Sequence, residues 1–262
     1  MPEDGLDPLD ASIEQATEVL LKFSIPLYQT DREGRPSLNG TGFFVKAGGK
    51  TFLVSAAHVM DTAKKHGLFF YATPGKVRHL SGRLLRSRGE EDRENDLIDI
   101  GILELSNESV PPYPEVEKFA MDISYLRPRF RPRTAKHYIF IGFPATKSEV
   151  SNQRREVTVT AYAFRNEPID EGSYAAHGLN PDTHIALKLD LNRGFGPGGI
   201  KRHFPKPQGM SGSPIIVLFD ENDESQSRVF SVVGVATTYR KASRLVFGTD
   251  VGYVIDAIEH AA

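Results

Sequence analysis

The chain of 262 residues contains no cysteine. This absence excludes disulfide bonds, zinc sites built from thiolates and a cysteine nucleophile, and it removes the usual sequence mark of an oxidising compartment. The chain also lacks an apolar run long enough to cross a bilayer. The acidic start Met1–Gly5 is not followed by the apolar core of a secretory signal. We therefore expect a protein of the cytoplasm with no membrane partner.

Neither sign of charge is in large excess, because the chain has 32 Lys and Arg residues and 34 Asp and Glu residues. The net charge of -2 gives no overall field that would hold nucleic acid, so we do not expect a nucleic-acid partner. The arginine- and proline-rich run 127–133 could touch nucleic acid, but a solvated linker is the favoured interpretation. No histidines have the spacing of a metal motif, so we expect no metal and no cofactor.

What the chain does contain is a series of short β-rich segments separated by turn residues. A helix with a capping box at Ser12–Gln15 precedes them, and Lys46–Lys50 predicts the tight turn of a hairpin. Further strands are predicted at 68–72, 77–84, 98–105, 137–142, 155–164, 184–191, 214–219 and 229–238. This order indicates an all-β sandwich or a pair of barrels and not alternating βα units.

The proline-rich segment 107–133 interrupts this series, since proline has no amide hydrogen to donate to a neighbouring strand. We place the boundary between two β-domains there. The predicted organisation is an N-terminal extension with a short helix (1–22), a first β-domain (23–108), a linker (109–133), a second β-domain (134–253) and a C-terminal helix (254–262).

Two distant segments carry a candidate nucleophile and a candidate base for acyl transfer. A serine hydroxyl is weakly nucleophilic at neutral pH and needs a base within hydrogen-bond reach, for which histidine is suited. His58, at the end of Ser55–His58, is the candidate base, although a lone histidine is more often structural. Ser211, within Gly209–Pro214, is the candidate nucleophile, although that segment alone could be a mere turn.

Asp99 is the candidate partner of the base. It lies between apolar residues in Leu97–Leu103, where an unpaired carboxylate would be costly. The Nδ1 hydrogen of His58 would satisfy it. Asp96 follows a charged turn, and we interpret it as a solvated residue without a role in the site.

Glycines on both sides of Ser211 permit a sharp turn of the backbone. The amides of Gly209 and Ser211 are therefore expected to form an oxyanion hole. Three motifs in the order His, Asp and Ser, each in a strand context, favour a serine protease over three unrelated turns. An α/β-hydrolase is excluded, because it needs Gly-x-Ser-x-Gly followed by Asp and His, whereas position 213 is serine.

These motifs, together with Gly40–Phe43 at the start of a strand, resemble those of the chymotrypsin-like serine peptidases. The resemblance is closer to the disulfide-free bacterial branch that includes HtrA-type and glutamyl-endopeptidase-type enzymes, and it covers about residues 23–262. It implies two antiparallel six-stranded β-barrels, with the base and acid on the first barrel and the nucleophile on the second.

The resemblance also implies a substrate site. The segment 233–237 resembles the strand that borders the primary specificity pocket, which assigns Thr237, Thr238 and Tyr239 to substrate binding. The hydroxyl of Thr237 is expected beside the catalytic aspartate. Gly252 resembles the glycine on the opposite wall of the pocket.

This chain departs from the family pattern at several positions, which limits what the resemblance implies about specificity and activation. Pro205 stands where trypsin-like enzymes have an aspartate at the pocket floor, so a preference for Arg or Lys has no support there. Asp250 could still approach from the other wall. Met210 replaces the aspartate that pairs with a newly cut N-terminus, so activation by that ion pair is not expected.

The function we expect is that of a serine endopeptidase that cleaves protein or peptide substrates through an acyl-enzyme, in regulated proteolysis inside the cell. The alternative is a protease-like sensor or binding module, whose active site is inactive or forms only when a regulatory protein partner docks. The loops 193–208 and 147–155 leave room for such regulation, and the first of them could gate access to the site.

Overall fold

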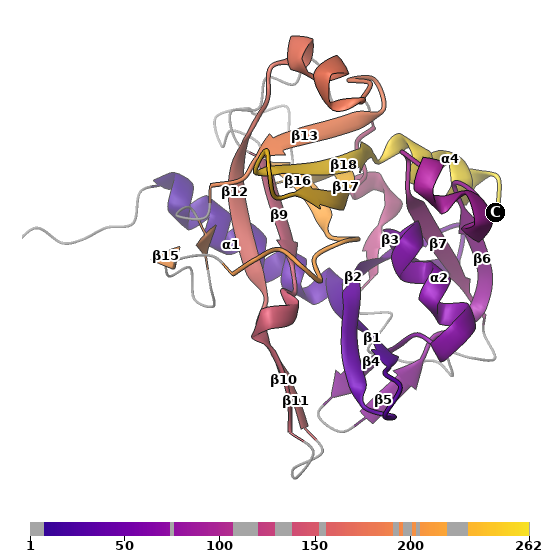
Figure 1. Cartoon of the computed structure of the whole chain (residues 1–262). Helices are drawn as coiled ribbons and strands as arrows, with labels where there is room; N and C mark the ends of the chain where they lie inside the picture. Colours follow the sequence, from indigo (N-terminus) through magenta and orange to yellow (C-terminus); the bar gives the residue numbers. More distant parts are fainter. Residues whose placement is uncertain are drawn as a thin grey trace, which may run out of the picture.

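The computed structural model describes residues 8–73, 76–106, 120–128, 138–151, 156–190, 194–195, 201–202, 205–218 and 230–261. Their strands form two large, mostly antiparallel sheets, with helices near both ends of the chain (Figure 1). The predicted all-β fold with an N-terminal and a C-terminal helix is confirmed.

The first sheet has the strand order β5-β4-β1-β2-β3-β7-β6, and β8 pairs with β2 in parallel. Its strands are β1 (Ser24–Thr30), β2 (Pro36–Ala47), β3 (Lys50–Ala56), β4 (Phe69–Thr73), β5 (Lys76–His79), β6 (Gly82–Arg86), β7 (Ile100–Leu105) and β8 (Ala120–Asp122). Within the described part of the chain, β5 and β6 do not pair with each other. This sheet is therefore a half-barrel, where a closed barrel was expected.

The second sheet has the order β13-β18-β17-β16-β9-β12-β14-β15. Its strands are β9 (Tyr138–Gly142), β12 (Tyr162–Pro168), β13 (His184–Lys188), β14 (Gly194–Phe195), β15 (Lys201–Arg202), β16 (Pro214–Leu218), β17 (Phe230–Arg240) and β18 (Leu245–Asp250). A further pairing of β12 with β13 closes six strands into a barrel. A separate hairpin of β10 (Ser148–Ser151) and β11 (Glu156–Val159) extends away from the barrel (Figure 1).

Three described α-helices accompany the sheets: α1 (Pro8–Phe23), α2 (Ala57–His66) and α4 (Gly252–Glu259). The helix α1 begins four residues before the predicted capping box, at a proline, which the first turn of a helix tolerates. The helix α2 was not predicted. Five short 3-10 turns complete the described elements: η1 (Glu90–Asn95), η2 (Ile123–Tyr125), η3 (Ala145–Lys147), η4 (Glu171–Ser173) and η5 (Ala175–His177).

The predicted hairpin joins β2 to β3. Gly48 and Gly49 form its two-residue turn with φ angles of 56° and 75°, the geometry that matches the twist of antiparallel strands. The strand predicted at 77–84 is in fact two strands, β5 and β6. The strands β1 and β18 were not predicted, and β18 proves important for the site.

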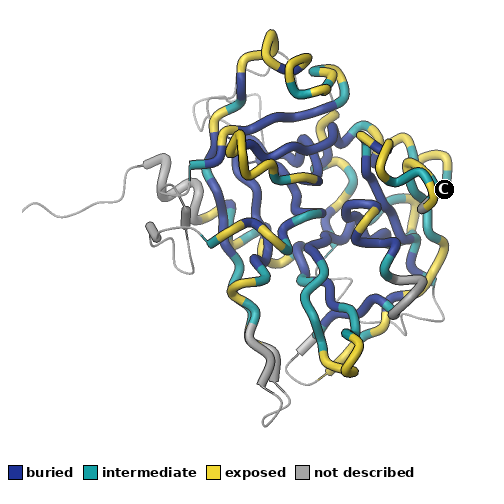
Figure 2. Tube along the Cα trace, viewed as in Figure 1, coloured by how far each residue is buried: buried dark blue, intermediate teal, exposed yellow. Residues whose placement is uncertain are grey.

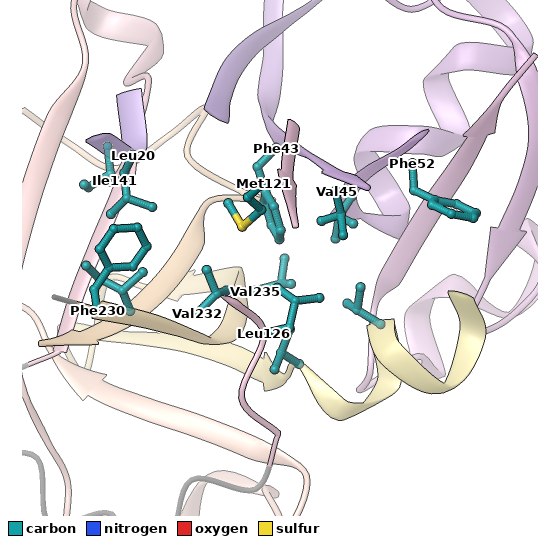
Figure 3. Close-up of a cluster of buried hydrophobic side chains, with 14 of the residues drawn as sticks. Leu20, Phe43, Val45, Phe52, Met121, Leu126, Ile141, Phe230, Val232 and Val235 are labelled. Carbon is teal, nitrogen blue, oxygen red and sulfur yellow. The ribbon is translucent and has the colours of Figure 1, made fainter. Parts of the chain in front are cut away.

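Buried segments, dark blue in Figure 2, run through both sheets. The largest apolar cluster among the described residues lies between the two sheets and includes residues of α1 and α4 (Figure 3). Phe43 and Phe52 of the first sheet and Ile141 of the second are fully buried in it, and so is Leu20 of α1. Each such side chain stabilises the fold by roughly 1.5–3 kcal/mol relative to an exposed one. This packing fixes the two sheets, and therefore the two halves of the site, against each other.

The described part of the predicted linker touches both sheets. β8 lies beside β2, whereas Leu126 forms a bridge with Val232 of β17, and the amide of Arg127 donates to the carbonyl of Val232 at 2.8 Å. The other residues of 109–133 lie outside the described ranges, so the domain boundaries stay a prediction. No described helix combines the length and apolar character needed to cross a membrane.

Candidate active site

His58 is the second residue of α2, which begins directly where β3 ends. Its Nδ1 lies 2.6 Å from Oδ2 of Asp99, and its backbone amide donates to Oδ1 of the same carboxylate at 2.9 Å. The side chain of Asp99 is only 10% exposed, whereas that of His58 is 42% exposed. The carboxylate is thus buried against one edge of the imidazole, and the other edge faces the open side of the site.

Asp99 stands just before β7 in a left-handed backbone conformation, with a φ of 48°. A non-glycine residue in this conformation needs support from its surroundings. The support comes from Asp96, whose Oδ1 accepts from the amides of Ile98 at 3.2 Å and Asp99 at 3.0 Å. The carbonyl of Asp99 also accepts from the amide of Ala57 at 2.9 Å.

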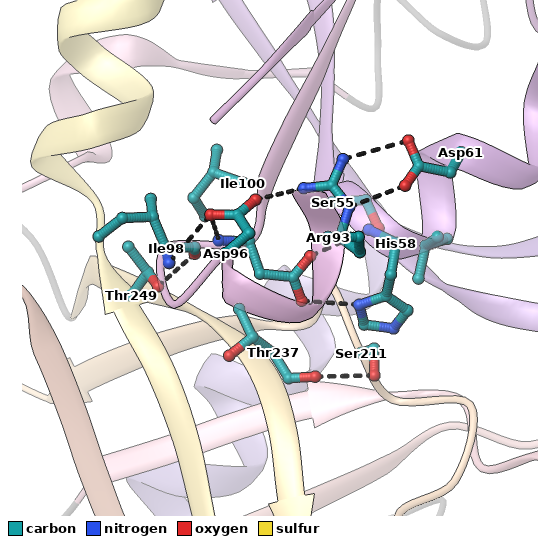
Figure 4. A network of polar contacts seen from close by, with 12 residues as sticks. Ser55, His58, Asp61, Arg93, Asp96, Ile98, Ile100, Ser211, Thr237 and Thr249 are labelled. Atoms are coloured by element: carbon teal, nitrogen blue, oxygen red, sulfur yellow. Dashed lines mark hydrogen bonds and ion pairs between the residues drawn. The ribbon is translucent and has the colours of Figure 1, made fainter. Parts of the chain in front are cut away.

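Asp96 is therefore not the solvated turn residue that we expected, because its side chain is 1% exposed. Its second carboxylate oxygen accepts from Arg93 and from the hydroxyl of Ser87 (Figure 4). The sequence places Asp96 in a charged turn, but the fold buries that turn against α2. A buried carboxylate needs such partners, because desolvation is costly.

Arg93 continues this network to α2. Its Nε donates to Asp61 at 2.8 Å, and Arg86 donates to the same carboxylate at 2.6 Å. Burial raises the pKa of Asp61, but the hydrogen bonds and charges of the two arginines outweigh burial and hold that pKa below its usual value. The network fixes the start of α2, which carries His58, to the turn that carries Asp99.

The second sheet also holds this turn. His184 of β13 contacts the carbonyl of Leu97 through Nε2 at 3.0 Å, and the hydroxyl of Thr249 in β18 donates to the carbonyl of Ile98 at 2.5 Å. Asp99 is therefore connected to both sheets through its turn, although the chain places it on the first.

Ser211 lies in a turn before β16, between two glycines whose φ angles are both 90°. A Cβ at Gly212 would lie 2.0 Å from the carbonyl oxygen of Thr41 and 2.1 Å from Oγ of Ser55. A Cβ at Gly209 would lie 2.9 Å from Phe143 O. Backbone angle and lack of space both require glycine at these positions.

Thr41 of β2 joins the turn of Ser211 to the first sheet. Its amide donates to the carbonyl of Ser211 at 2.8 Å, and its hydroxyl donates to the carbonyl of Gly209 at 3.0 Å. The amide of Phe143 donates to the same hydroxyl at 3.1 Å, and Ser55 donates to the carbonyl of Thr41 at 2.6 Å. The orientations of two peptide groups in the turn thus depend on one buried threonine.

The amides of Gly209 and Ser211 donate no hydrogen bond within the described part of the chain, whereas the amide of Met210 between them donates to Pro207 at 3.1 Å. Two free donors on either side of a satisfied one suit an anion-binding concavity. The hydroxyl of Ser211 donates to the carbonyl of Thr237 at 3.0 Å. Among the described residues it has no hydrogen bond to His58, although the imidazole points toward it (Figure 4).

A recess opens beside Ser211. Its described lining is Phe140, Pro207, Met210, Ser211, Ala236, Thr237, Thr238, Tyr239 and Val246. The predicted Thr237, Thr238 and Tyr239 thus lie together at the nucleophile. The hydroxyl of Thr237, however, donates to the carbonyl of Phe247 at 3.4 Å and not to Asp99.

Gly252 is not on the opposite wall. It is the first residue of α4 and lines a different cavity, together with Asp250. Val246 of β18 lines the recess instead, beside Tyr239, with which it pairs across β17 and β18. The apolar run at 245–247, five residues before Gly252, is the sequence signal that could have predicted β18 as a strand and identified Val246.

The remaining predicted positions give a mixed result. Pro205 is half-buried and does not line the recess, whereas Pro207 does. Asp250 accepts from the amide of Gly252 at 2.8 Å, in the other cavity, so it gives no basis for a preference for Arg or Lys. Half of the loop 193–208 lies outside the described residues. No group of three or more metal-ligating side chains occurs in the ranges that the structure describes.

Comparison with known proteins finds similarity in structure only. No protein-family model matches the sequence, and no curated protein matches it. The chain is similar to the solved structure of the VesB protease of Vibrio cholerae, with a TM-score of 0.55 at 15% sequence identity. The match covers 90% of this chain but only 63% of the length of that one. The two chains share the chymotrypsin-like fold, and at this identity the likeness concerns the fold alone.

Proposed function

We propose that this protein is a serine endopeptidase, with Ser211 as nucleophile, His58 as general base and Asp99 as the group that orients the base. The observation that supports this proposal most is the contact of Asp99 with both the ring and the backbone of His58, at 2.6 Å and 2.9 Å. A carboxylate on Nδ1 leaves Nε2 free to accept a proton and stabilises the imidazolium that results.

In the proposed reaction, Oγ of Ser211 forms a bond to the carbonyl carbon of the substrate while its proton passes to Nε2 of His58. The amides of Gly209 and Ser211 stabilise the negative oxygen, and one such donor is typically worth about 3 kcal/mol. The C–N bond then breaks, and His58 gives the proton to the leaving amine. Water releases the acyl group by the same steps, with His58 again as base.

The hydroxyl of Ser211 must leave the carbonyl of Thr237 and turn toward His58 before it attacks. This resting contact favours the second candidate function, a protease-like sensor whose site assembles only when a partner docks. The bacterial branch of the family, the cytoplasmic location and a regulatory protein partner stay predictions from the sequence.

A fluorophosphonate probe tests the proposal, because it reacts with a serine only when a base and an oxyanion hole activate it. We expect the probe to label the wild-type protein at Ser211, and mass spectrometry of the labelled peptide identifies the residue. Ser211→Ala and His58→Ala should abolish labelling, whereas Ser243→Ala, which changes an exposed serine, should not. Labelling that survives Ser211→Ala contradicts the proposed nucleophile, and a correctly folded protein that is never labelled supports the sensor.

A further inference from the structure

We infer that the recess beside Ser211 selects a small, uncharged aliphatic side chain, alanine or valine, on the substrate residue before the cleaved bond. This inference rests on the proposed function, since it assigns the substrate class to the same site. It is carried by the free edge of β17, by the size of the recess and by the chemistry of its walls.

The free edge of β17 decides how a substrate lies. β16 pairs with β17 only up to Val235, whereas β17 continues to Arg240. In the described structure, the edge of residues 237–240 that faces away from β18 therefore has no strand partner. An extended peptide can add to such an edge through its backbone. Alternate side chains of that peptide would then point toward the protein, one of them into the recess beside Ser211.

The size of the recess excludes large side chains. Its cavity volume is only about 20 Å³, whereas the cavity beside Gly252 has about 680 Å³. Tyr239 and Val246 lie side by side on the paired strands β17 and β18, and both line the recess. Phe140 and Met210 also line the recess and belong to the buried core of the barrel, so these two side chains cannot move aside for a larger substrate side chain.

The walls exclude charged side chains. None of the described lining residues is charged, and Phe140, Met210, Ala236 and Val246 are all buried apolar residues. A lysine, arginine or glutamate side chain placed there would lose its water without gaining a counter-charge, which is costly. The polar side chains among the described lining residues are those of Ser211, Thr237, the exposed Thr238 and the half-buried Tyr239, and all four are uncharged hydroxyl groups.

A library of fluorogenic tetrapeptides that varies the residue before the cleaved bond tests this inference on the full chain. We expect kcat/KM with alanine or valine to exceed that with phenylalanine, lysine or glutamate by at least about tenfold, as for other small apolar pockets. Tyr239→Ala should enlarge the recess and raise the rate for leucine or phenylalanine, relative to alanine, by about tenfold. The matched control is Tyr253→Ala, which removes a tyrosine exposed at 38% on α4 and should leave the preference unchanged.

The fluorophosphonate label separates the possible failures. A labelled protein that prefers a bulky or charged residue contradicts this inference and leaves the proposed function intact. A folded protein that is neither labelled nor active on any peptide contradicts the proposed function, and the inference fails with it. If Tyr239→Ala does not fold, Val246→Ala enlarges the same recess from β18, and an unchanged preference in a folded variant overturns the assigned wall.

Discussion

The half of the candidate site on the first sheet is held by charged side chains, whereas the half on the second sheet is held by backbone groups. Asp61, Arg86, Arg93 and Asp96 form a continuous set of ion pairs beneath His58 and Asp99. The turn of Ser211, in contrast, depends on glycines and on hydrogen bonds to peptide carbonyls. We therefore expect the first half of the site to be sensitive to changes of charge and pH, and the second half to be sensitive to changes of side-chain volume.

The largest effect is expected from Gly212→Ala, which tests the half that depends on volume. The added Cβ would meet two fixed groups of the first sheet at about 2 Å, at a backbone angle that disfavours a side chain. We expect a loss of about 4 kcal/mol in the free energy of unfolding, from overpacking and backbone strain together. Urea denaturation measures this loss.

Gly49→Ala is the matched control, because Gly49 also has a positive φ, of 75°, but nothing lies within 4 Å of a Cβ there. It should lose only about 1 kcal/mol, from backbone strain alone. Equal losses in the two variants would show that space around the nucleophile turn is not limiting.

Asp61→Ala tests the half that depends on charge. It leaves two largely buried arginines without their shared carboxylate, at 17% and 15% exposure. Breaking a buried pair from one side is strongly destabilising, and we expect a loss of about 3 kcal/mol. Glu94→Gln, in the same region but exposed, should change stability little. A small loss in Asp61→Ala would mean that water replaces the missing carboxylate.

Asp96→Ala should lower the rate of the reaction more than it lowers the stability of the protein. Without the carboxylate, the amide of Asp99 loses its acceptor, and the left-handed backbone at Asp99 loses its support. We expect kcat/KM to fall by about 100-fold, the effect of a misplacement of about 1 Å. Asp96→Asn keeps an acceptor oxygen and should recover part of the rate. The rate of fluorophosphonate labelling should fall in parallel, and an unchanged rate in a folded Asp96→Ala would contradict this role.

Thr41→Val sharpens the comparison where the two halves meet. Valine has nearly the same shape but lacks the hydroxyl that binds Gly209 and Phe143. We expect kcat to fall by about tenfold, equivalent to 1.4 kcal/mol, with a smaller change in KM. Thr41→Ser keeps the hydroxyl and should restore kcat. If serine does no better than valine, the methyl group and not the hydroxyl positions the turn.

The smallest expected effect is on the pH dependence of stability. The pKa of Asp61 is lower in the folded chain than its usual value, so the stability that its ion pairs contribute is complete above the usual carboxyl pKa of about 3.9. That contribution is lost as the pH falls through the lower, folded pKa. Asp61→Asn should therefore destabilise the protein more at pH 7 than at pH 3, measured as the shift of the urea midpoint. An equal shift at both pH values would contradict the sign of this pKa change.

The sequence alone was sufficient to predict the all-β fold, the terminal helices and the candidates His58, Asp99 and Ser211. These features depend on local patterns: alternation of apolar residues, small residues around a turn, and an aspartate flanked by apolar side chains. A pattern of this kind is visible within ten residues of the chain. The contact of His58 with Asp99, and the position of Ser211 near His58, required the structure, because these residues lie far apart in the chain.

Only the tertiary structure decided the surroundings of these candidates. The charged neighbours of Asp96 in the sequence indicate a solvated residue. The packing of its turn against α2 instead buries Asp96 and supplies Arg93 as its partner. Val246, and not Gly252, lines the recess, because strand pairing, which no local pattern records, places Val246 beside Tyr239. Local composition determines which elements form. Which side chains are buried, and which partners they have, depends on residues that are far apart in the chain. These contacts decide the charge of the site, its size and its access to substrate.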